Sequence, residues 1–79
     1  MENFNKKFND LLIDKLNVTI DELKPEVKFT DLGADSLDMV ELTMDFEKTF
    51  NITIPDNDVD KIITIGDAET YLKTALNIN

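Results

Sequence analysis

Apolar side chains recur along this chain at the spacing of helices and not at the alternating spacing of half-buried strands. In the first segment they stand at positions i, i+4, i+7, i+8 and i+12, which predicts a helix over residues 3–16. The residues of this stripe are Phe4, Phe8, Leu11, Leu12 and Leu16. No segment alternates apolar and polar residues convincingly, so the pattern predicts an all-α fold.

The middle of the chain predicts two helices with a break between them. Residues 36–50 keep the helical period, and Asp35 can accept hydrogen bonds from the N–H groups of the first turn. The period stops before Pro55, because the residue before a proline is driven toward an extended conformation. Asp56 is the expected N-cap of the short helix that follows. Its predicted inward side chains are Val59, Ile62 and Ile63.

A last helix is predicted from Thr64 onward, because Thr64 and Asp67 can together cap its first turn. This helix is expected to bury Ala68, Tyr71, Leu72 and Ala75. Residues 17–35 lack a long period and are expected to form a loop. A chain of 79 residues has the size of one domain. The predicted architecture is therefore a small four-helix bundle over residues 1–79, with three longer helices, one short helix and a long first connection.

The side chains that enzymes use most often for acid–base and nucleophilic chemistry are missing from this chain. It contains no His, Cys, Arg or Trp. Ser36 is its only serine and has no histidine that could activate it. Without Cys there is no disulfide framework, and no apolar run is long enough to span a membrane. We expect a protein that is not an enzyme, has no metal site and stays in the cytoplasm.

Negative charge is concentrated in the middle of the sequence. The net charge is −9, and residues 29–60 hold nine acidic residues and one Lys. A protein with this charge is a poor partner for nucleic acid or for an anionic membrane surface. Basic protein surfaces are the expected partners.

The helix predicted over residues 36–50 carries two apolar stripes. Met39, Leu42, Phe46 and Phe50 form the stripe expected to face the core. Leu37, Val40 and Met44 form a second stripe on nearly the opposite side, which we call the outer stripe. Its acidic flanks are Asp38, Glu41 and Asp45 on one side and Glu47 on the other. Burial on both sides is one alternative, but it would draw these carboxylates into low dielectric, so we favour an exposed docking surface.

The segment Asp31-Leu32-Gly33-Ala34-Asp35-Ser36-Leu37-Asp38 resembles the prosthetic-group attachment motif of the acyl carrier proteins. The similarity extends from Phe29 to Leu72. It implies that a phosphopantetheinyl transferase, using coenzyme A and Mg²⁺, attaches 4′-phosphopantetheine to the hydroxyl of Ser36. It also implies that Asp35 and Asp38 meet the cations and the metal of that transferase. The arm would supply a thiol that carries acyl chains as thioesters.

We expect two further sets of residues beyond Ser36, one for partner contacts and one for the acyl chain. Basic surfaces of fatty acid synthesis enzymes and of acyltransferases would contact the outer stripe and its acids, namely Leu37, Asp38, Val40, Glu41, Met44, Glu47, Asp56 and Asp60. We hypothesise that the acyl chain is sheltered by Phe46, Ile54, Val59, Ile62, Ala68 and Leu72. Similar proteins more often have Leu in place of Phe46, so a shorter pocket is expected. They also more often have an acid in place of Lys48, so a different partner affinity is expected at that corner.

Other functions are compatible with parts of the same sequence. Within the carrier family, we favour fatty acid synthesis by discrete enzymes over a polyketide or other specialised acyl pathway. The carrier is expected to be a monomer. A small acidic adaptor without a prosthetic group would show a similar helical surface. The acids between Asp56 and Asp67 match the spacing of an EF-hand loop, but Lys61 stands where the turn needs Gly and Asp67 replaces the bidentate Glu.

Overall fold

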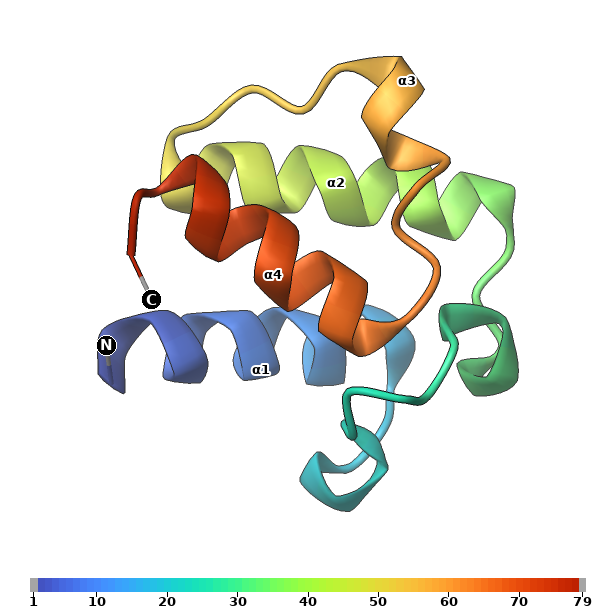
Figure 1. Cartoon of the computed structure of the whole chain (residues 1–79). Coiled ribbons are helices and arrows are strands. Elements are labelled where there is room, and N and C mark those ends of the chain that lie inside the picture. The colour runs from blue at the N-terminus through green and yellow to red at the C-terminus, as the bar shows by residue number, and fades with distance from the viewer. Residues whose placement is uncertain (1, 79) are drawn as a thin grey trace.

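The computed structural model describes residues 2–78, which form four α-helices around one hydrophobic core (Figure 1). The helices are α1 (Glu2–Leu16), α2 (Ser36–Phe50), α3 (Asp56–Val59) and α4 (Ile65–Ala75). α1 and α2 run antiparallel, α4 crosses this pair, and the short α3 packs beside α2. The predicted all-α bundle of three longer helices and one short helix is confirmed. Within residues 2–78 the only β-type pairing is one isolated bridge between Lys28 and Thr64.

Aromatic rings from α1 and α2 form one side of the core. The rings of Phe8 and Phe46 stack with their centroids 5.6 Å apart, and those of Phe4 and Phe50 lie 5.2 Å apart. Both separations lie in the range where aromatic pairs add to the stabilisation from burial. The predicted core face of α2 is confirmed, since Leu42 and Phe46 are fully buried and Met39 and Phe50 are partly buried.

The long connection between α1 and α2 is ordered rather than open. It contains two short 3-10 helices, η1 (Ile20–Glu22) and η2 (Phe29–Leu32). Besides the bridge of Lys28 to Thr64, the N–H of Gly66 donates to the carbonyl of Pro25 at 2.9 Å. A Cβ at Gly66 would lie 3.0 Å from that carbonyl oxygen, so glycine permits this close approach. The loop is thereby held against the start of α4.

The start of each longer predicted helix is close to its observed position, but the cap of α3 differs from the prediction. Thr64 accepts from the N–H of Asp67 at 3.0 Å, as expected for α4. Asp56 was expected to be the N-cap of α3, and this is wrong because Pro55 occupies that position. The carbonyl of Pro55 accepts from the N–H of Asp58 at 2.9 Å, so the helix already begins at Asp56.

Two side chains that were expected to be buried are exposed. Ile63 is 53% exposed, because the chain between α3 and α4 is not helical and turns Ile62 and Ile65 inward instead. Ala75 is exposed as well. The buried face of α4 passes from Leu72 to the partly buried Leu76, four residues later, and this step leaves Ala75 on the outer side.

Candidate functional site

Ser36 is the first residue of α2, and its side chain is exposed. The preceding turn brings it there: Gly33 adopts φ 88°, a left-handed conformation that closes η2, and Ala34 is buried beneath the turn. Among the hydrogen bonds within residues 2–78, none involves the Ser36 hydroxyl. This hydroxyl is therefore available to an external reagent.

The carboxylates beside Ser36 form a reciprocal cap at the start of α2. Asp35 Oδ1 accepts from the N–H of Asp38 at 2.9 Å, and Asp38 Oδ2 accepts from the N–H of Asp35 at 3.2 Å. The expected capping role of Asp35 is confirmed. The two carboxylates stabilise the first turn and also surround the Ser36 hydroxyl with negative charge.

The outer stripe lies on the surface of the molecule. Leu37, Val40 and Met44 are 64%, 47% and 54% exposed. Burial of α2 on both sides is therefore wrong, and the outer stripe is an apolar surface available for contacts with another molecule.

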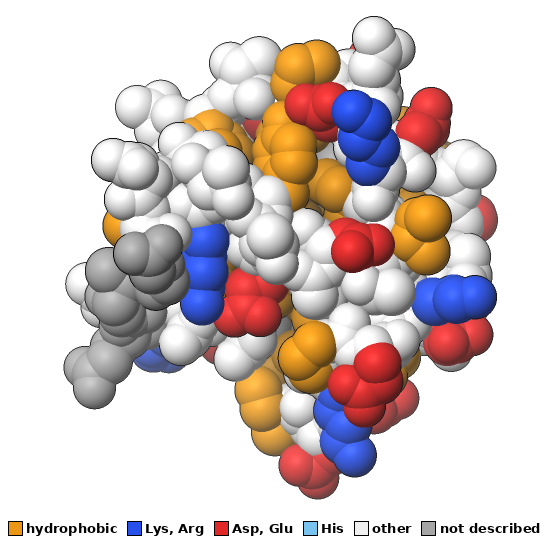
Figure 2. Space-filling view, viewed as in Figure 1, with side chains coloured by type: hydrophobic (Ala, Val, Ile, Leu, Met, Phe, Trp, Pro, Cys, Tyr) orange, Lys and Arg blue, Asp and Glu red, His pale blue; other side chains and the backbone are white. Residues whose placement is uncertain are grey.

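A groove of about 520 Å³ separates α2 from α3. It is lined by Val40, Thr43, Met44, Glu47, Ile54, Asp56, Val59 and Asp60. The structure thus brings five of the predicted partner-binding residues together with Ile54 and Val59 of the predicted acyl pocket. Space-filling Figure 2 shows apolar side chains beside α3, with acidic and basic side chains next to them.

The remaining residues of the predicted acyl pocket lie in the closed core behind this groove. Phe46, Ile62, Ala68 and Leu72 are buried, and the ring of Phe46 stacks on Phe8 of α1. None of these four lines the groove. The six predicted residues are close in one core cluster, but the structure does not bring them together around one open cavity.

Glu47 has a structural contact that the sequence pattern did not reveal. Its Oε2 accepts a hydrogen bond of 2.8 Å from the backbone N–H of Ile54, which is only 6% exposed. This bond ties the segment before α3 to α2. Glu47 therefore shapes the groove as well as lining it.

A second unpredicted contact joins α3 to α4. The hydroxyl of Tyr71 donates to Asp58 Oδ2 at 2.7 Å, and Lys61 Nζ lies 3.5 Å from the other carboxylate oxygen. The hydrogen bond to Asp58, together with burial, raises the pKa of Tyr71 to about 12. No sequence signal connects these residues, because they are 13 positions apart and belong to different helices.

The acids at EF-hand spacing serve separate purposes in this structure. Asp58 binds Tyr71, whereas Asp67 accepts from the N–H groups of Ile63 and Thr64 at 3.2 Å and 3.1 Å. Within residues 2–78, no group of three acidic side chains is arranged to hold a metal ion. In the same range, no helix has the length and apolar character needed to cross a membrane.

Lys15 of α1 also contacts the acids beside the outer stripe. Its Nζ lies 3.2 Å from Glu41 Oε1 and 3.4 Å from Asp45 Oδ2. The helical period could not predict this contact, because it does not show that α1 approaches this flank of α2.

Comparison with known proteins gives consistent matches over nearly the whole chain. Residues 6–72 match the family model described as the phosphopantetheine attachment site. An acyl carrier protein of Porphyromonas gingivalis is 52% identical over 77 residues, which covers 96% of this chain and 99% of that protein. An acyl carrier protein of Wolinella succinogenes is 52% identical over 66 residues, covering 82% of this chain and 87% of that protein.

The fold agrees with a solved structure as well. A crystal structure of an acyl carrier protein from Thermotoga maritima superposes with a TM-score of 0.81 at 28% identity, covering 96% of this chain and 89% of that one. The match to the family model and the two relatives at 52% identity show the same family independently of the fold. The chain therefore belongs to the acyl carrier protein family, whose prosthetic group is phosphopantetheine.

Proposed function

We propose that Ser36 carries a 4′-phosphopantetheine arm and that the protein transports acyl chains on it between the discrete enzymes of fatty acid biosynthesis. The observation that carries this proposal is the exposed Ser36 hydroxyl at the first position of α2, inside the attachment motif of the family. When attached, the arm supplies the thiol that forms the thioester. The protein itself acts as a carrier and not as a catalyst.

The surroundings of Ser36 suit a phosphodiester with the arm directed outward. The unsatisfied N–H groups of the first turn and the positive end of the helix dipole favour a phosphate at this position. The carboxylates of Asp35 and Asp38 repel it at short range. We infer that the arm leaves the surface of α2 and that both carboxylates meet the cations of the transferase during attachment.

Partner enzymes dock, in this proposal, on the outer stripe through basic surfaces. An exposed apolar centre with an acidic rim combines contact area with electrostatic attraction of a basic partner. The carboxylates of Asp38, Asp56 and Asp60 extend this rim from the start of α2 to α3. We further propose one carrier domain over residues 1–79 that acts as a monomer in the cytoplasm, consistent with the absence of Cys.

The acyl chain enters, in this proposal, through the groove between α2 and α3. Ile54 and Val59 line its wall, and the four core residues behind them would have to separate to admit a chain. Because the ring of Phe46 is fully buried and stacked on Phe8 in the core, we expect the melting temperature to rise with acyl length only up to medium chains. A rise that continues with long chains would contradict the short pocket.

Intact mass spectrometry tests the attachment directly. Incubation with coenzyme A and a phosphopantetheinyl transferase should add one phosphopantetheine to the wild-type chain and none to Ser36→Ala. Thr49→Ala is the matched control, because it removes another exposed hydroxyl from α2 and should leave the modification intact. An unmodified wild-type chain would refute the carrier function. The acyl species on protein purified from its native cell would then distinguish fatty acid synthesis from a specialised pathway.

A further inference from the structure

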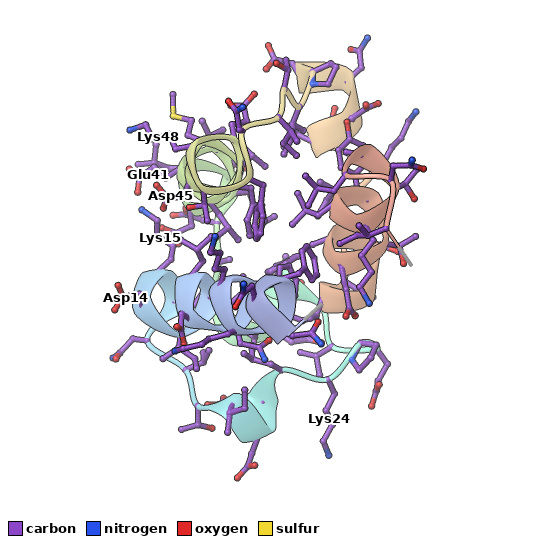
Figure 3. All side chains as sticks on the ribbon, turned by 90° about the vertical axis from the view of Figure 1, so that its left-hand side faces the viewer. Asp14, Lys15, Lys24, Glu41, Asp45 and Lys48 are labelled. Carbon is purple, nitrogen blue, oxygen red and sulfur yellow. The ribbon has the colours of Figure 1, made fainter. Side chains whose placement is uncertain are left out.

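The two flanks of the outer stripe differ in how their acids are paired. On the side facing α1, Lys15 Nζ lies within 3.4 Å of carboxylate oxygens of both Glu41 and Asp45. Figure 3 shows Lys48, Glu41, Asp45, Lys15 and Asp14 one after another along this side of the α1–α2 pair. Two lysines and three carboxylates lie there, so much of the negative charge on this flank is compensated.

On the side facing α3 the acids are not neutralised in this way. Asp56 and Asp60 line the groove, and among the ion pairs within residues 2–78 neither of them has a partner. We therefore expect a basic partner to be attracted more strongly to the α3 side of the outer stripe than to the α1 side.

Lys15 is held more firmly than an ordinary surface lysine. Its side chain is 25% exposed, whereas that of Lys6, which pairs with Asp10 on the same helix, is 78% exposed. The hydrogen bond to Glu41, reinforced by Asp45, raises the pKa of Lys15 above its ordinary value of 10.5, so the charged ammonium group is favoured in this position. A basic partner that approached Glu41 would have to compete with an ammonium group already in place.

We propose that Lys15 is a specificity-determining residue that masks Glu41 and Asp45 and directs basic partners toward the α3 side of the outer stripe. This inference rests on the proposed carrier function, because it concerns the same docking surface. Glu41, expected from the sequence to be a partner contact, then contributes little to docking until a partner displaces Lys15.

The test measures the KM for the carrier and kcat of a phosphopantetheinyl transferase. Coenzyme A is saturating, the carrier concentration is varied, and the ionic strength is low. Lys15→Gln should lower the KM for the carrier about threefold with kcat unchanged, because two carboxylates become available to the cations of the transferase. Added salt should reduce this difference, since screening weakens exposed charge interactions.

Lys6→Gln is the matched control for the loss of charge. It also removes one Lys from a chain of net charge −9 and also breaks one ion pair with a carboxylate. Lys6 lies nine residues before Lys15, about 180° around the helix, on the other side of α1. Its variant should keep the wild-type KM within about 1.5-fold, and Lys15→Arg, which keeps the charge, should also behave as wild type.

A double substitution tests the masking itself. Glu41→Gln alone should raise KM less than 1.5-fold, whereas in the Lys15→Gln background it should raise KM about twofold or more. Equal KM values for Lys15→Gln and Lys6→Gln, or equal effects of Glu41→Gln in both backgrounds, would overturn the inference. A KM that rises in Lys15→Gln would also overturn it and would indicate a purely structural role. If the transferase leaves even the wild-type chain unmodified, the proposed function fails first, and this inference fails with it.

Discussion

Replacing Glu47 tests the hydrogen bond that ties the segment before α3 to α2. Glu47→Ala removes the acceptor for the backbone N–H of Ile54, a residue that is only 6% exposed. A buried N–H without an acceptor costs about 1–3 kcal/mol. Because Glu47 is only half-buried and water can partly replace it, we expect a loss of about 1.5 kcal/mol in the free energy of unfolding.

Thermal unfolding gives the first measurement of this effect. In a domain of this size, 1 kcal/mol shifts the melting temperature by about 4–8 °C, so Glu47→Ala should melt about 6–12 °C below the wild type. Glu47→Gln keeps a carbonyl acceptor in the same place and should lose less than about a third of that amount. The exposed Glu26→Ala is the charge control and should not lower the melting temperature, because removing an acid from a chain of net charge −9 relieves repulsion.

Amide hydrogen exchange locates the same effect in the structure. The N–H of Ile54 should exchange faster in Glu47→Ala than in the wild type, while amides in the middle of α1 change only in proportion to global stability. Two results would refute the reasoning: an unchanged melting temperature in Glu47→Ala, or an equal loss in Glu47→Gln. The second result would show that the charge of Glu47, and not its hydrogen bond, stabilises the fold.

Two further predictions concern ionisable side chains in the second half of the chain. Tyr71→Phe keeps the ring but loses the 2.7 Å hydrogen bond to Asp58, and should lower the free energy of unfolding in denaturant by about 1 kcal/mol. In the wild type, ultraviolet titration of the single tyrosine should give a pKa of about 12, and a value near 10 would contradict this hydrogen bond. The N–H groups of Thr64 and Ile63 hold the pKa of Asp67 below its ordinary value of 3.8, so its stabilisation should be complete above pH 3.8 and disappear as the pH falls through the lowered value. The stability gap between wild type and Asp67→Asn should therefore shrink in acid, and a gap independent of pH would count against this account.

The positions of the longer helices could be predicted from the sequence because their causes are local. The apolar period of α1 and the carboxylate of Asp35 before α2 act over a few residues, and the structure confirms both. Two of the wrong predictions lie in the segment from Pro55 to Ile63, where the chain is only briefly helical. Pro55, with its extended ψ of 150°, starts α3 one residue earlier than an Asp56 cap would, and Ile63 turns outward because the chain around it is not helical.

The candidate site, like the fold, could be predicted only where its causes lie within one helix. The exposure of the outer stripe followed from the cost of burying its acidic neighbours, and the structure confirms it. Which of these acids form ion pairs could not be predicted from the sequence, because Glu41 pairs with a lysine 26 positions away. The sequence also did not reveal that the ring of Phe46, expected to line an acyl pocket, packs on Phe8 of α1 and does not line the groove.

The amino-acid sequence by itself predicted an acidic all-α bundle with one candidate attachment serine. Helical period, capping and the attachment motif each depend on residues close together in the chain, so no tertiary information was needed. Only the tertiary structure decided which carboxylates are paired, since that depends on how helices approach one another. α1 brings Lys15 to Glu41, α4 brings Tyr71 to Asp58, and the folded groove leaves Asp56 and Asp60 facing solvent.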